Sequence, residues 1–387
     1  MIPPLLRILE VAFAAATVAS LAYFALCLWS VARFKRSRKF GNVESAPLPP
    51  VSIFKPLKGT DRAMYESFRS QCLQDYPEYE IIFGVSDLDD PAIAWVERLK
   101  AEFPQRAIRL VICRENLGAN TKVSNLIQML REARFDHLIV SDSDIRVPHN
   151  YLRRVMTPLA DPKVGLVTCL YRGVASSGLW SRLESLAIST DFCPGVLVAR
   201  QIEGVKFGLG ATMAFRRRDL QAIGGFETLA DYLADDYQLG QRISALGLRV
   251  EIPEVVVETF VSSYTLGGFF AHQLRWARTI RDSRFSGYVG MGITYGLPWA
   301  VLTLILARGA VWAWTLLAIT AAMRILMALS VGKGILRDRN VARWLWLLPL
   351  RDVIAVIVWL VSFVGQTVTW RGERFRLKNG KLSRIQR

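Results

Sequence analysis

Residues 8–32 are almost entirely apolar, and the basic sequence RFKRSRK follows them without a break. About 20 apolar residues are enough for a helix to cross the core of a bilayer. A cleaved signal peptide carries its positive charge before the apolar run, whereas here the order is reversed. We therefore expect residues 1–40 to form an uncleaved membrane anchor whose C-terminal side faces the cytoplasm.

The last third of the chain returns to membrane chemistry. Residues 286–307, 310–331 and 353–369 are mostly apolar, and Arg308 and Arg324 border or interrupt them. A charged side chain within a membrane is costly, so it usually faces a protein interior or reaches the interface. We expect transmembrane or interfacial helices over 286–370, including an interfacial helix over 337–352 that is rich in Trp, Leu and Arg.

The positive charge of the chain also indicates a membrane. The formal net charge is +16, and much of it flanks the apolar segments, as in residues 333–343 and in a basic tail over 371–387. This placement fits anionic lipid headgroups better than nucleic acid. Both basic segments favour the cytoplasmic side, so we expect one of the three C-terminal apolar segments to be interfacial or re-entrant. No nucleic-acid partner is expected.

Between the apolar ends, the sequence has the pattern of an α/β domain. Short aliphatic runs alternate with helical stretches, which indicates parallel βαβ units. The expected strands are VSIFKP, EIIFGV, IRLVIC and HLIV. We place the domain over residues 41–263, after the Pro-rich link GNVESAPLPP. The five cysteines form no CxxC pair and the three histidines are scattered, which argues against a zinc site.

An acidic motif follows the fourth expected strand. Asp142 and Asp144 come directly after HLIVS, and the alternation of an extended chain points both carboxylates in the same direction. Ligands of open α/β sheets bind at the carboxyl ends of the strands. Two such carboxylates suit a divalent cation that carries a diphosphate. The alternative is a solvated turn, because Asp and Ser are common turn residues.

Seven motifs, in this order along the chain, resemble those of the ceramide glucosyltransferase family. The members of this family are inverting membrane glycosyltransferases with a GT-A catalytic domain. The resemblance covers roughly residues 50–285. The motifs are KPLKG at 55–59, YPEYEIIFGVSDLDDPA at 76–92, TKVSNL at 121–126, DSDIRV at 142–147, KVGLV at 163–167, AIGGFETLADYLADDYQLG at 222–240, and the RW of HQLRW at 272–276.

This resemblance implies a role for each matching residue. Asp87 would bind the uridine of a UDP-sugar and Lys122 its diphosphate, while Asp142 and Asp144 would hold Mg²⁺ or Mn²⁺. Asp236 would be the general base that takes the proton of an acceptor hydroxyl. Other interpretations stay open for two of these positions: Lys122 as a solvated loop lysine, and Asp236 as a favourable charge at a helix N-terminus.

Three neighbouring acidic residues have interpretations of their own. Asp89 and Asp90 could bind uridine or cap the helix that follows them. Asp235 would orient the site or cap the helix beginning YQLG.

The resemblance also extends to a juxtamembrane helix over residues 264–285. There Arg275 would contact the diphosphate and Trp276 would line the acceptor site, although an amphipathic interfacial helix explains the stretch equally well. The family pattern has Gln or Arg where this chain has His272. This departure leaves the identity of the acceptor open.

Together these features predict a multi-pass enzyme, with its catalytic domain on the cytosolic side of a bacterial inner membrane. It would transfer one hexose, from UDP-glucose or UDP-N-acetylglucosamine, to a lipid hydroxyl such as that of ceramide, with inversion. One alternative is a hopanoid glycosyltransferase, and another is a processive polysaccharide synthase. A catalytically inactive scaffold would not need the carboxylates.

Overall fold

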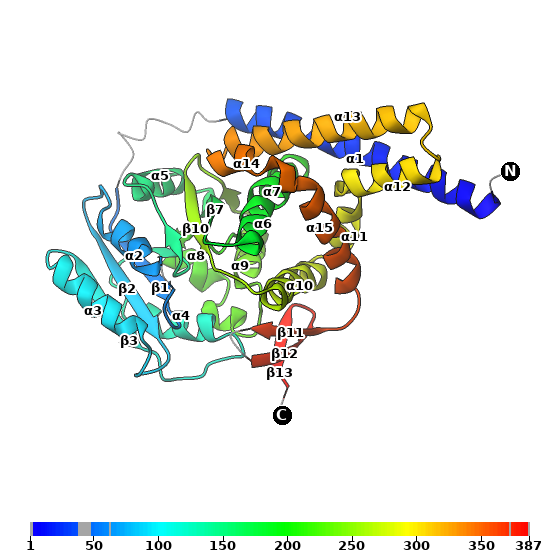
Figure 1. Cartoon of the computed structure of the whole chain (residues 1–387). Coiled ribbons are helices and arrows are strands. Elements are labelled where there is room, and N and C mark those ends of the chain that lie inside the picture. Colours follow the sequence, from blue (N-terminus) through cyan, green and yellow to red (C-terminus); the bar gives the residue numbers. More distant parts are fainter. Residues whose placement is uncertain (1–2, 38–47, 62, 371–372, 386–387) are drawn as a thin grey trace. The chain divides into compact units, whose positions relative to one another are not determined.

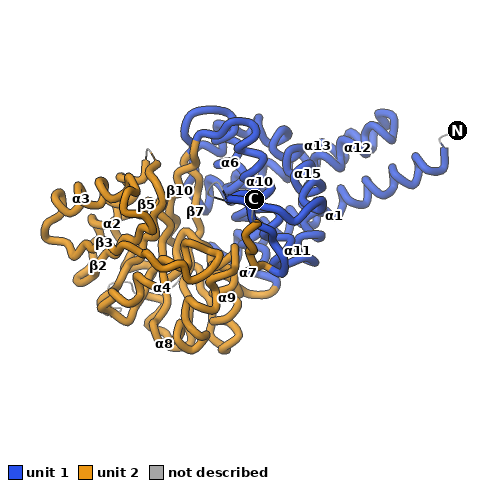
Figure 2. Tube along the Cα trace, turned by 90° about the horizontal axis from the view of Figure 1, so that it is seen from below, with its two compact units in different colours: residues 1–36, 175–202, 263–379 blue, residues 37–174, 203–262, 380–387 orange. Residues whose placement is uncertain are grey.

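The computed structural model describes residues 3–37, 48–61, 63–370 and 373–385. Most of the Pro-rich link and the end of RFKRSRK lie outside them. The chain divides into two compact units, which Figure 2 distinguishes by colour. The sheet unit comprises residues 37–174, 203–262 and 380–387, and the helical unit comprises residues 1–36, 175–202 and 263–379. Figure 1 labels the elements of both units.

A parallel half-sheet forms the first part of the sheet unit. Its strands are β1 (Val51–Pro56), β2 (Tyr79–Val85), β3 (Ala107–Ile112) and β4 (His137–Val140), in the order β3-β2-β1-β4. Every residue of β1 and β2 is buried. Nearly continuous apolar strands of this kind are typical of a parallel sheet covered on both faces. The strands align so that their carboxyl ends share one edge, as Phe54 opposite Val140 shows.

Helices connect these strands as the sequence predicts. The connecting helices are α2 (Met64–Cys72), α3 (Ala92–Glu102) and α4 (Thr121–Arg131). Asn120 caps α4, because its side chain accepts a hydrogen bond from the N–H of Val123. Side chains from α4 and from β1, β2 and β4 share one apolar core, which includes Phe54, Ile82, Leu126 and Leu138.

An antiparallel strand continues the same sheet. β8 (Met213–Arg216) runs against β4, with Val140 opposite Met213, and also pairs with β6 (Val164–Thr168), which is followed by β9 (Arg249–Glu251). Because β8 runs in the opposite direction, the loop that precedes it reaches the sheet edge where β4 ends. This topology brings residues 204–212 next to the acidic motif.

The other elements of the sheet unit are short. β5 (Ile145–Arg146), β10 (Val256–Val261) and β7 (Leu170–Ala175) form a three-stranded sheet, in which Thr259 lies opposite Ile145. The rest are α5 (Tyr151–Met156), η1 (Thr157–Ala160), α8 (Arg217–Ala222), η3 (Phe226–Leu229), α9 (Asp235–Ala245) and β13 (Lys381–Arg384).

Long apolar helices dominate the helical unit. Over the described residues, three helical stretches are long and apolar enough to cross a membrane, namely Pro4–Arg36, Val311–Lys333 and Leu345–Ser362. A fourth would be the pair Phe285–Thr294 and Gly296–Leu306, which is bent by 56°. The elements are α1 (Pro4–Arg36), α6 (Leu179–Ala187), η2 (Ile188–Phe192), α7 (Cys193–Glu203), α10 (Leu266–Ser283), α11 (Phe285–Gly290), η4 (Met291–Thr294), α12 (Gly296–Leu306), α13 (Val311–Ala328), η5 (Leu329–Lys333), α14 (Arg339–Arg343), η6 (Leu345–Leu347) and α15 (Leu348–Ser362).

One predicted apolar segment has different bounds in the structure. Residues 353–369 were expected to form one apolar segment, but α15 ends at Ser362, and Gly365 then adopts a φ of +83°. A left-handed residue of this kind ends a helix. Two antiparallel strands follow, β11 (Thr367–Trp370) and β12 (Glu373–Lys378).

Arg324 lies in the interior of the helical unit, as the sequence predicts. Its guanidinium is 2% exposed and contacts the carboxylates of Asp191 at 2.6 Å and of Asp352 at 2.7 Å. The helical unit thus neutralises the charge within its own core, as a buried ion pair requires. The α/β fold with apolar helices at both ends is confirmed.

Candidate active site

The acidic motif begins where β4 ends, and a buried lysine holds its backbone. Lys55, on the neighbouring strand β1, donates to the carbonyl oxygen of Asp142 at 2.7 Å and to the hydroxyl of Ser141 at 3.2 Å. Burial lowers the pKa of Lys55 to about 8, although the charges of Asp144 and Asp142 oppose this shift. Lys55 was not among the predicted site residues. Its signal in the sequence is a lysine within an otherwise apolar strand.

Asp144 lies two residues after Asp142, and strand β10 contacts it. The hydroxyl of Thr259, on β10, donates to the Oδ2 atom of Asp144. Burial and the negative charge of Asp142 raise the pKa of Asp144 to about 6. A raised pKa of this kind marks Asp144 as lying in excess negative charge, which a cation would neutralise.

Lys122 links two acidic segments. Its ammonium lies 2.8 Å from Oδ1 of Asp142 and 3.2 Å from Oδ2 of Asp235. Burial by itself would lower the pKa of Lys122, but the carboxylates of Asp142 and Asp235 outweigh burial and raise it. Lys122 is 8% exposed. The solvated-loop interpretation of this lysine is therefore wrong for this structure.

Asp235 and Asp236 begin helix α9, and their surroundings differ. Asp235 is buried and pairs with Lys122. Asp236 accepts hydrogen bonds from the N–H of Gly210 at 2.8 Å and of Tyr237 at 2.7 Å. Burial and the charge of Asp235 raise the pKa of Asp236. Of the two carboxylates, Asp235 forms the ion pair with Lys122, whereas backbone N–H groups hold Asp236.

Glycines allow the acidic segments to approach one another. A Cβ atom on Gly210 would lie 2.9 Å from Oδ2 of Asp142 and 3.4 Å from Oδ2 of Asp236, so both carboxylates border the same small space. A Cβ on Gly240, in α9, would lie 2.3 Å from the backbone of Phe207 and Gly208. The loop before β8 therefore packs directly on the backbone of α9 and carries Gly210 to the site.

The acidic residues after β2 stabilise their own loop. Asp87 is exposed and accepts a hydrogen bond from the N–H of Asp89 at 3.0 Å. Asp90 accepts from the N–H of Ala92 at 2.9 Å, at the start of α3, and from the N–H of Gly59. Asp90 thus has a structural role at this helix start, as one of the two interpretations of the sequence proposed. Asp87 remains accessible at the carboxyl edge of the sheet.

Arg275 and Trp276 belong to the helical unit, on α10. The guanidinium of Arg275 lies 3.2 Å from Nδ1 of His272, and the Nε2 atom of His272 lies 2.8 Å from a carboxylate oxygen of Glu184. The ring of Trp276 packs against two other rings, with its centroid 5.5 Å from that of His272 and 6.1 Å from that of Phe192. His272 is therefore the centre of a polar and aromatic cluster, and its neighbour Arg275 is part of it.

The acidic residues suit a metal that is bound together with a substrate. Over the described residues, no group of three or more His, Cys, Asp or Glu side chains could hold a metal ion. Mg²⁺ is usually held by one or two carboxylates together with substrate phosphates and waters. Asp142 and Asp144 fit this requirement, because they are adjacent, and the Asp142 side chain is 39% exposed. The two carboxylates thus suit a metal that shares its ligands with a diphosphate rather than a closed metal cage.

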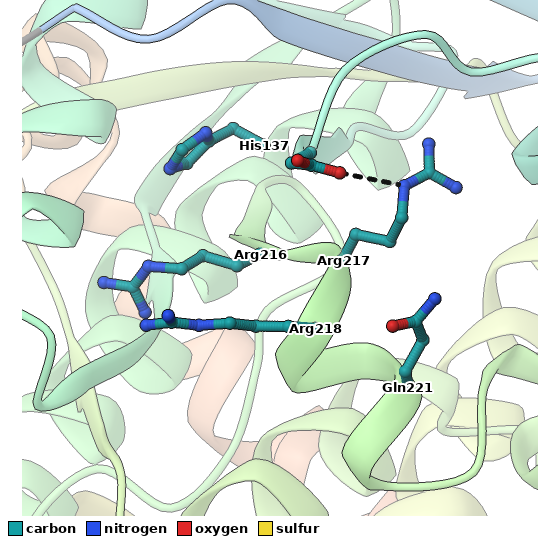
Figure 3. A pocket seen from close by; sticks show the side chains of 6 residues that line it. His137, Arg216, Arg217, Arg218 and Gln221 are labelled. Carbon is teal, nitrogen blue, oxygen red and sulfur yellow. Dashed lines mark ion pairs between the residues drawn. The ribbon is translucent and has the colours of Figure 1, made fainter.

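A hollow lined mainly by basic side chains lies at the other end of β4. It measures about 370 Å³, and Figure 3 shows the residues that line it, namely Asp136, His137, Arg216, Arg217, Arg218 and Gln221. Arg216 donates to the carbonyl of Val164 at 2.7 Å, and Arg217 donates to the carbonyl of Ala133 at 2.8 Å. These arginines hold loops together, so we do not assign the hollow to the acidic site.

The fold and the acidic cluster at the carboxyl edge of its sheet define a membrane-associated glycosyltransferase. The chain belongs to glycosyl transferase family 21, whose family model matches residues 12–383. The recognition drawn from the sequence motifs is confirmed.

Several characterised relatives act on lipids according to their names. The chain is 24% identical over 355 residues to ceramide glucosyltransferase 1 of Caenorhabditis elegans, covering 87% of this chain and 74% of that relative. It is 27% identical over 236 residues to ceramide glucosyltransferase 3 of the same organism, covering 61% and 51%. It is 26% identical over 222 residues to the beta-monoglucosyldiacylglycerol synthase of Synechocystis, covering 55% and 45%. The chain thus spans about three quarters of the first relative and about half of the other two.

A solved structure also matches most of the chain. The mannosyltransferase PcManGT from Pyrobaculum calidifontis, in complex with GDP-Man and Mn²⁺, has a TM-score of 0.53 and 21% identity. The match covers 92% of this chain and 99% of that one. At this identity the similarity concerns the fold alone, and it agrees with the predicted GT-A fold.

Proposed function

We propose that this protein transfers a single hexose from a UDP-sugar to the hydroxyl of a membrane lipid, with inversion at the anomeric carbon. The observation that carries the proposal is the position of Asp236. Its carboxylate borders the same space as Asp142, at the sheet edge where α/β folds bind nucleotides, and backbone N–H groups hold it, while Lys122 forms its ion pairs with Asp142 and Asp235.

Asp236 has the properties of a general base. A base works best when its pKa lies near the operating pH, and burial together with Asp235 raises the pKa of Asp236 toward that range. The hydrogen bonds from Gly210 and Tyr237 fix the direction of the carboxylate. In the proposed step, the lipid hydroxyl oxygen attacks the anomeric carbon, the bond from that carbon to the phosphate oxygen breaks, and Asp236 takes the hydroxyl proton.

Lys122 and the acidic motif would bind the leaving UDP. Mg²⁺ or Mn²⁺ on Asp142 and Asp144 would neutralise charge that develops on the diphosphate. Lys122 is buried and remains cationic, so it supplies a fixed positive charge in the same region. Asp87, exposed after the carboxyl end of β2, would accept from the uracil N–H of the donor. The roles of Arg275 with the diphosphate and of Trp276 with the acceptor remain predictions from the family motif.

The apolar helices and the names of the relatives support a lipid acceptor. The three or four apolar helices of the described residues would keep the catalytic unit near acceptors that cannot leave the bilayer. The relatives include a ceramide glucosyltransferase and a beta-monoglucosyldiacylglycerol synthase. We therefore propose a ceramide-type acceptor and UDP-glucose or UDP-N-acetylglucosamine as donor, with the sheet unit on the cytosolic side. A hopanoid polyol and a growing polysaccharide are the alternatives, and mass spectrometry of the products from purified enzyme separates all three.

The substitution Asp236→Asn tests the mechanism, with Asp235→Asn as its matched control. Asn keeps an oxygen for the Gly210 hydrogen bond but cannot take a proton, so kcat should fall by about 10³-fold or more while UDP binding persists. Asp235→Asn should instead weaken UDP binding, because it disturbs Lys122. Titration of UDP and single-turnover transfer measure both effects. Transfer by Asp236→Asn within tenfold of the wild type would remove Asp236 from the base role.

A further inference from the structure

The C-terminal strand pairs with the loop that leads into the catalytic helix. In the sheet unit, Tyr232 forms an antiparallel bridge with Lys381. The N–H of Leu233 donates to the carbonyl of Gly380 at 3.1 Å, and the N–H of Leu382 donates to the carbonyl of Asp231 at 2.7 Å. The C-terminal residues are thus fixed to a loop that ends at Asp235 and Asp236.

Side chains strengthen this pairing. The ring of Tyr232 lies 5.4 Å from the ammonium of Lys381 and 5.8 Å from the guanidinium of Arg242, on α9. Gly380 packs on the same ring, because a Cβ there would lie 3.2 Å from Cδ1 of Tyr232. Leu382 is 5% exposed. Tyr232 therefore connects the C-terminal strand with the catalytic helix.

The same loop also holds the segment that carries Lys122. The N–H of Asn120 donates to the carbonyl of Ala230 at 2.8 Å, and its side-chain amide donates to the carbonyl of Tyr232 at 2.7 Å. Asn120 is fully buried and caps α4, two residues before Lys122. One loop, residues 229–234, therefore positions the start of both helices that supply the charged groups of the site.

We propose that residues 380–385 act as a C-terminal latch, which holds loop 229–234 in the position that catalysis needs. The proposal rests on the proposed function of Asp236 and Lys122. Residues 380–385 belong to the same unit as this loop, and main-chain hydrogen bonds hold the two together. The docked latch is the active state, and Tyr232, Gly380 and Lys381 are positioning residues rather than catalytic ones.

A glycine substitution tests the latch against a matched control. Gly380 has a φ of +77°, so Gly380→Ala introduces both backbone strain and a contact with Tyr232. Gly247, in the same unit, has a φ of +80° and open space around it, so Gly247→Ala introduces the strain alone. We expect kcat to fall about tenfold in Gly380→Ala only, because a displacement of 1 Å at a catalytic group costs about 10²-fold.

The two variants should unfold at similar temperatures, which separates positioning from general stability. Equal kcat values in Gly380→Ala and Gly247→Ala would overturn the latch. The latch would also be overturned if Gly380→Ala, but not Gly247→Ala, lost both kcat and unfolding temperature. That result would indicate a structural role for Gly380.

A reversible cross-link tests the same proposal independently. The bonds that flank Tyr232 and Lys381 mark them as a non-hydrogen-bonded pair, whose Cα atoms in antiparallel sheets lie about 4.5 Å apart. This spacing suits a disulfide. The five native cysteines are buried, so oxidation of Tyr232→Cys/Lys381→Cys should join the new pair selectively.

We expect the reduced double variant to lose about tenfold in kcat through the missing Tyr232 contacts, and oxidation to restore most of it. An oxidised form less active than the reduced form would show that the latch must open, and failure to cross-link would show that it does not dock. Cross-linking is read by gel shift without any substrate. If the wild type transfers no sugar while the cross-link forms, the proposed function fails and the docking stands.

Discussion

Gly210→Ala is the substitution that best separates the geometry of the site from the stability of the fold. The new methyl would lie 2.9 Å from Oδ2 of Asp142, and ordinary contact begins near 3.4 Å, so this oxygen must move by about 0.5 Å. The Asp142 side chain is 39% exposed and can move at little cost, but its movement disturbs the 2.8 Å contact with Lys122. The backbone of Gly210 does not adopt a positive φ, so alanine causes no strain there.

The expected magnitudes differ for stability and activity. Replacing glycine by alanine at a compatible backbone stabilises a protein by about 0.4–1 kcal/mol through the unfolded state, which offsets the local crowding. The unfolding free energy should therefore change by less than about 1 kcal/mol. A displacement of about half an ångström at a catalytic carboxylate should cost about 10-fold in kcat, given about 10²-fold for 1 Å.

The assay combines thermal unfolding in detergent with initial rates of transfer from radiolabelled UDP-sugar to lipid. Gly195→Ala, in α7, is the control, because its new methyl meets no atom within 4 Å. It should leave both quantities near their wild-type values. A Gly210→Ala protein with full activity would refute the inference that Asp142 and Asp236 share one functional space.

Two further predictions concern charge. Glu80 is fully buried and accepts from Ser52, Arg109 and Arg134, and these bonds outweigh burial and lower its pKa below 4.5. Because the pKa of Glu80 is lower in the folded state, its carboxylate stabilises the fold above about pH 4.5, and this contribution is lost as the pH falls below that value. Glu80→Gln should therefore lower the free energy of unfolding by about 2 kcal/mol at pH 7 and flatten the acid side of a plot of stability against pH. An unchanged plot would contradict this stabilising role of Glu80. Chelation with EDTA should abolish transfer, Mg²⁺ or Mn²⁺ should restore it, and Asp144→Asn should raise the metal concentration needed; full activity in EDTA would exclude a metal at Asp142 and Asp144.

The sequence predicted the position of the acidic motif well, for a local reason. A run of buried β-branched residues can end only where polar residues begin, so HLIV followed by Ser141 and Asp142 marks a strand end in any α/β fold. The expected alternation of an extended chain is not seen, because Ser143 and Asp144 lie in a turn in which the N–H of Ile145 donates to the carbonyl of Asp142. Length and composition also revealed the apolar segments, but not all their bounds: the expected interfacial helix over 337–352 is divided between α14, η6 and α15, and α15 ends at Ser362.

Other parts of the site depend on contacts between distant segments. Lys55 lies 87 residues before Asp142, and Thr259 lies 115 residues after Asp144. Only the strand order of the sheet makes β1 the neighbour of β4, and only the second sheet brings β10 to β5. The antiparallel direction of β8 likewise brings Gly210 to the site, and periodicity does not reveal strand direction.

The partner of Arg324 illustrates the same division. The cost of a charge among apolar residues predicted an interior position, yet Asp191 and Asp352 were identifiable as partners only in the folded helical unit. The C-terminal residues show the contrast most clearly. Their basic character indicated a lipid-facing tail, whereas β13 pairs with loop 229–234 through main-chain bonds that any residue type could form.

The sequence by itself determined that this chain has helices apolar enough to cross a membrane, an α/β domain, and carboxylates at the ends of its strands, because hydrophobic pattern and local geometry act over a few residues. Only the tertiary structure decided which charges meet: Lys122 with Asp142 and Asp235, Lys55 with the backbone of Asp142, and the C-terminal strand with Tyr232. Such contacts join residues far apart in the chain, and their partners are selected by the packing of the whole unit rather than by any local pattern.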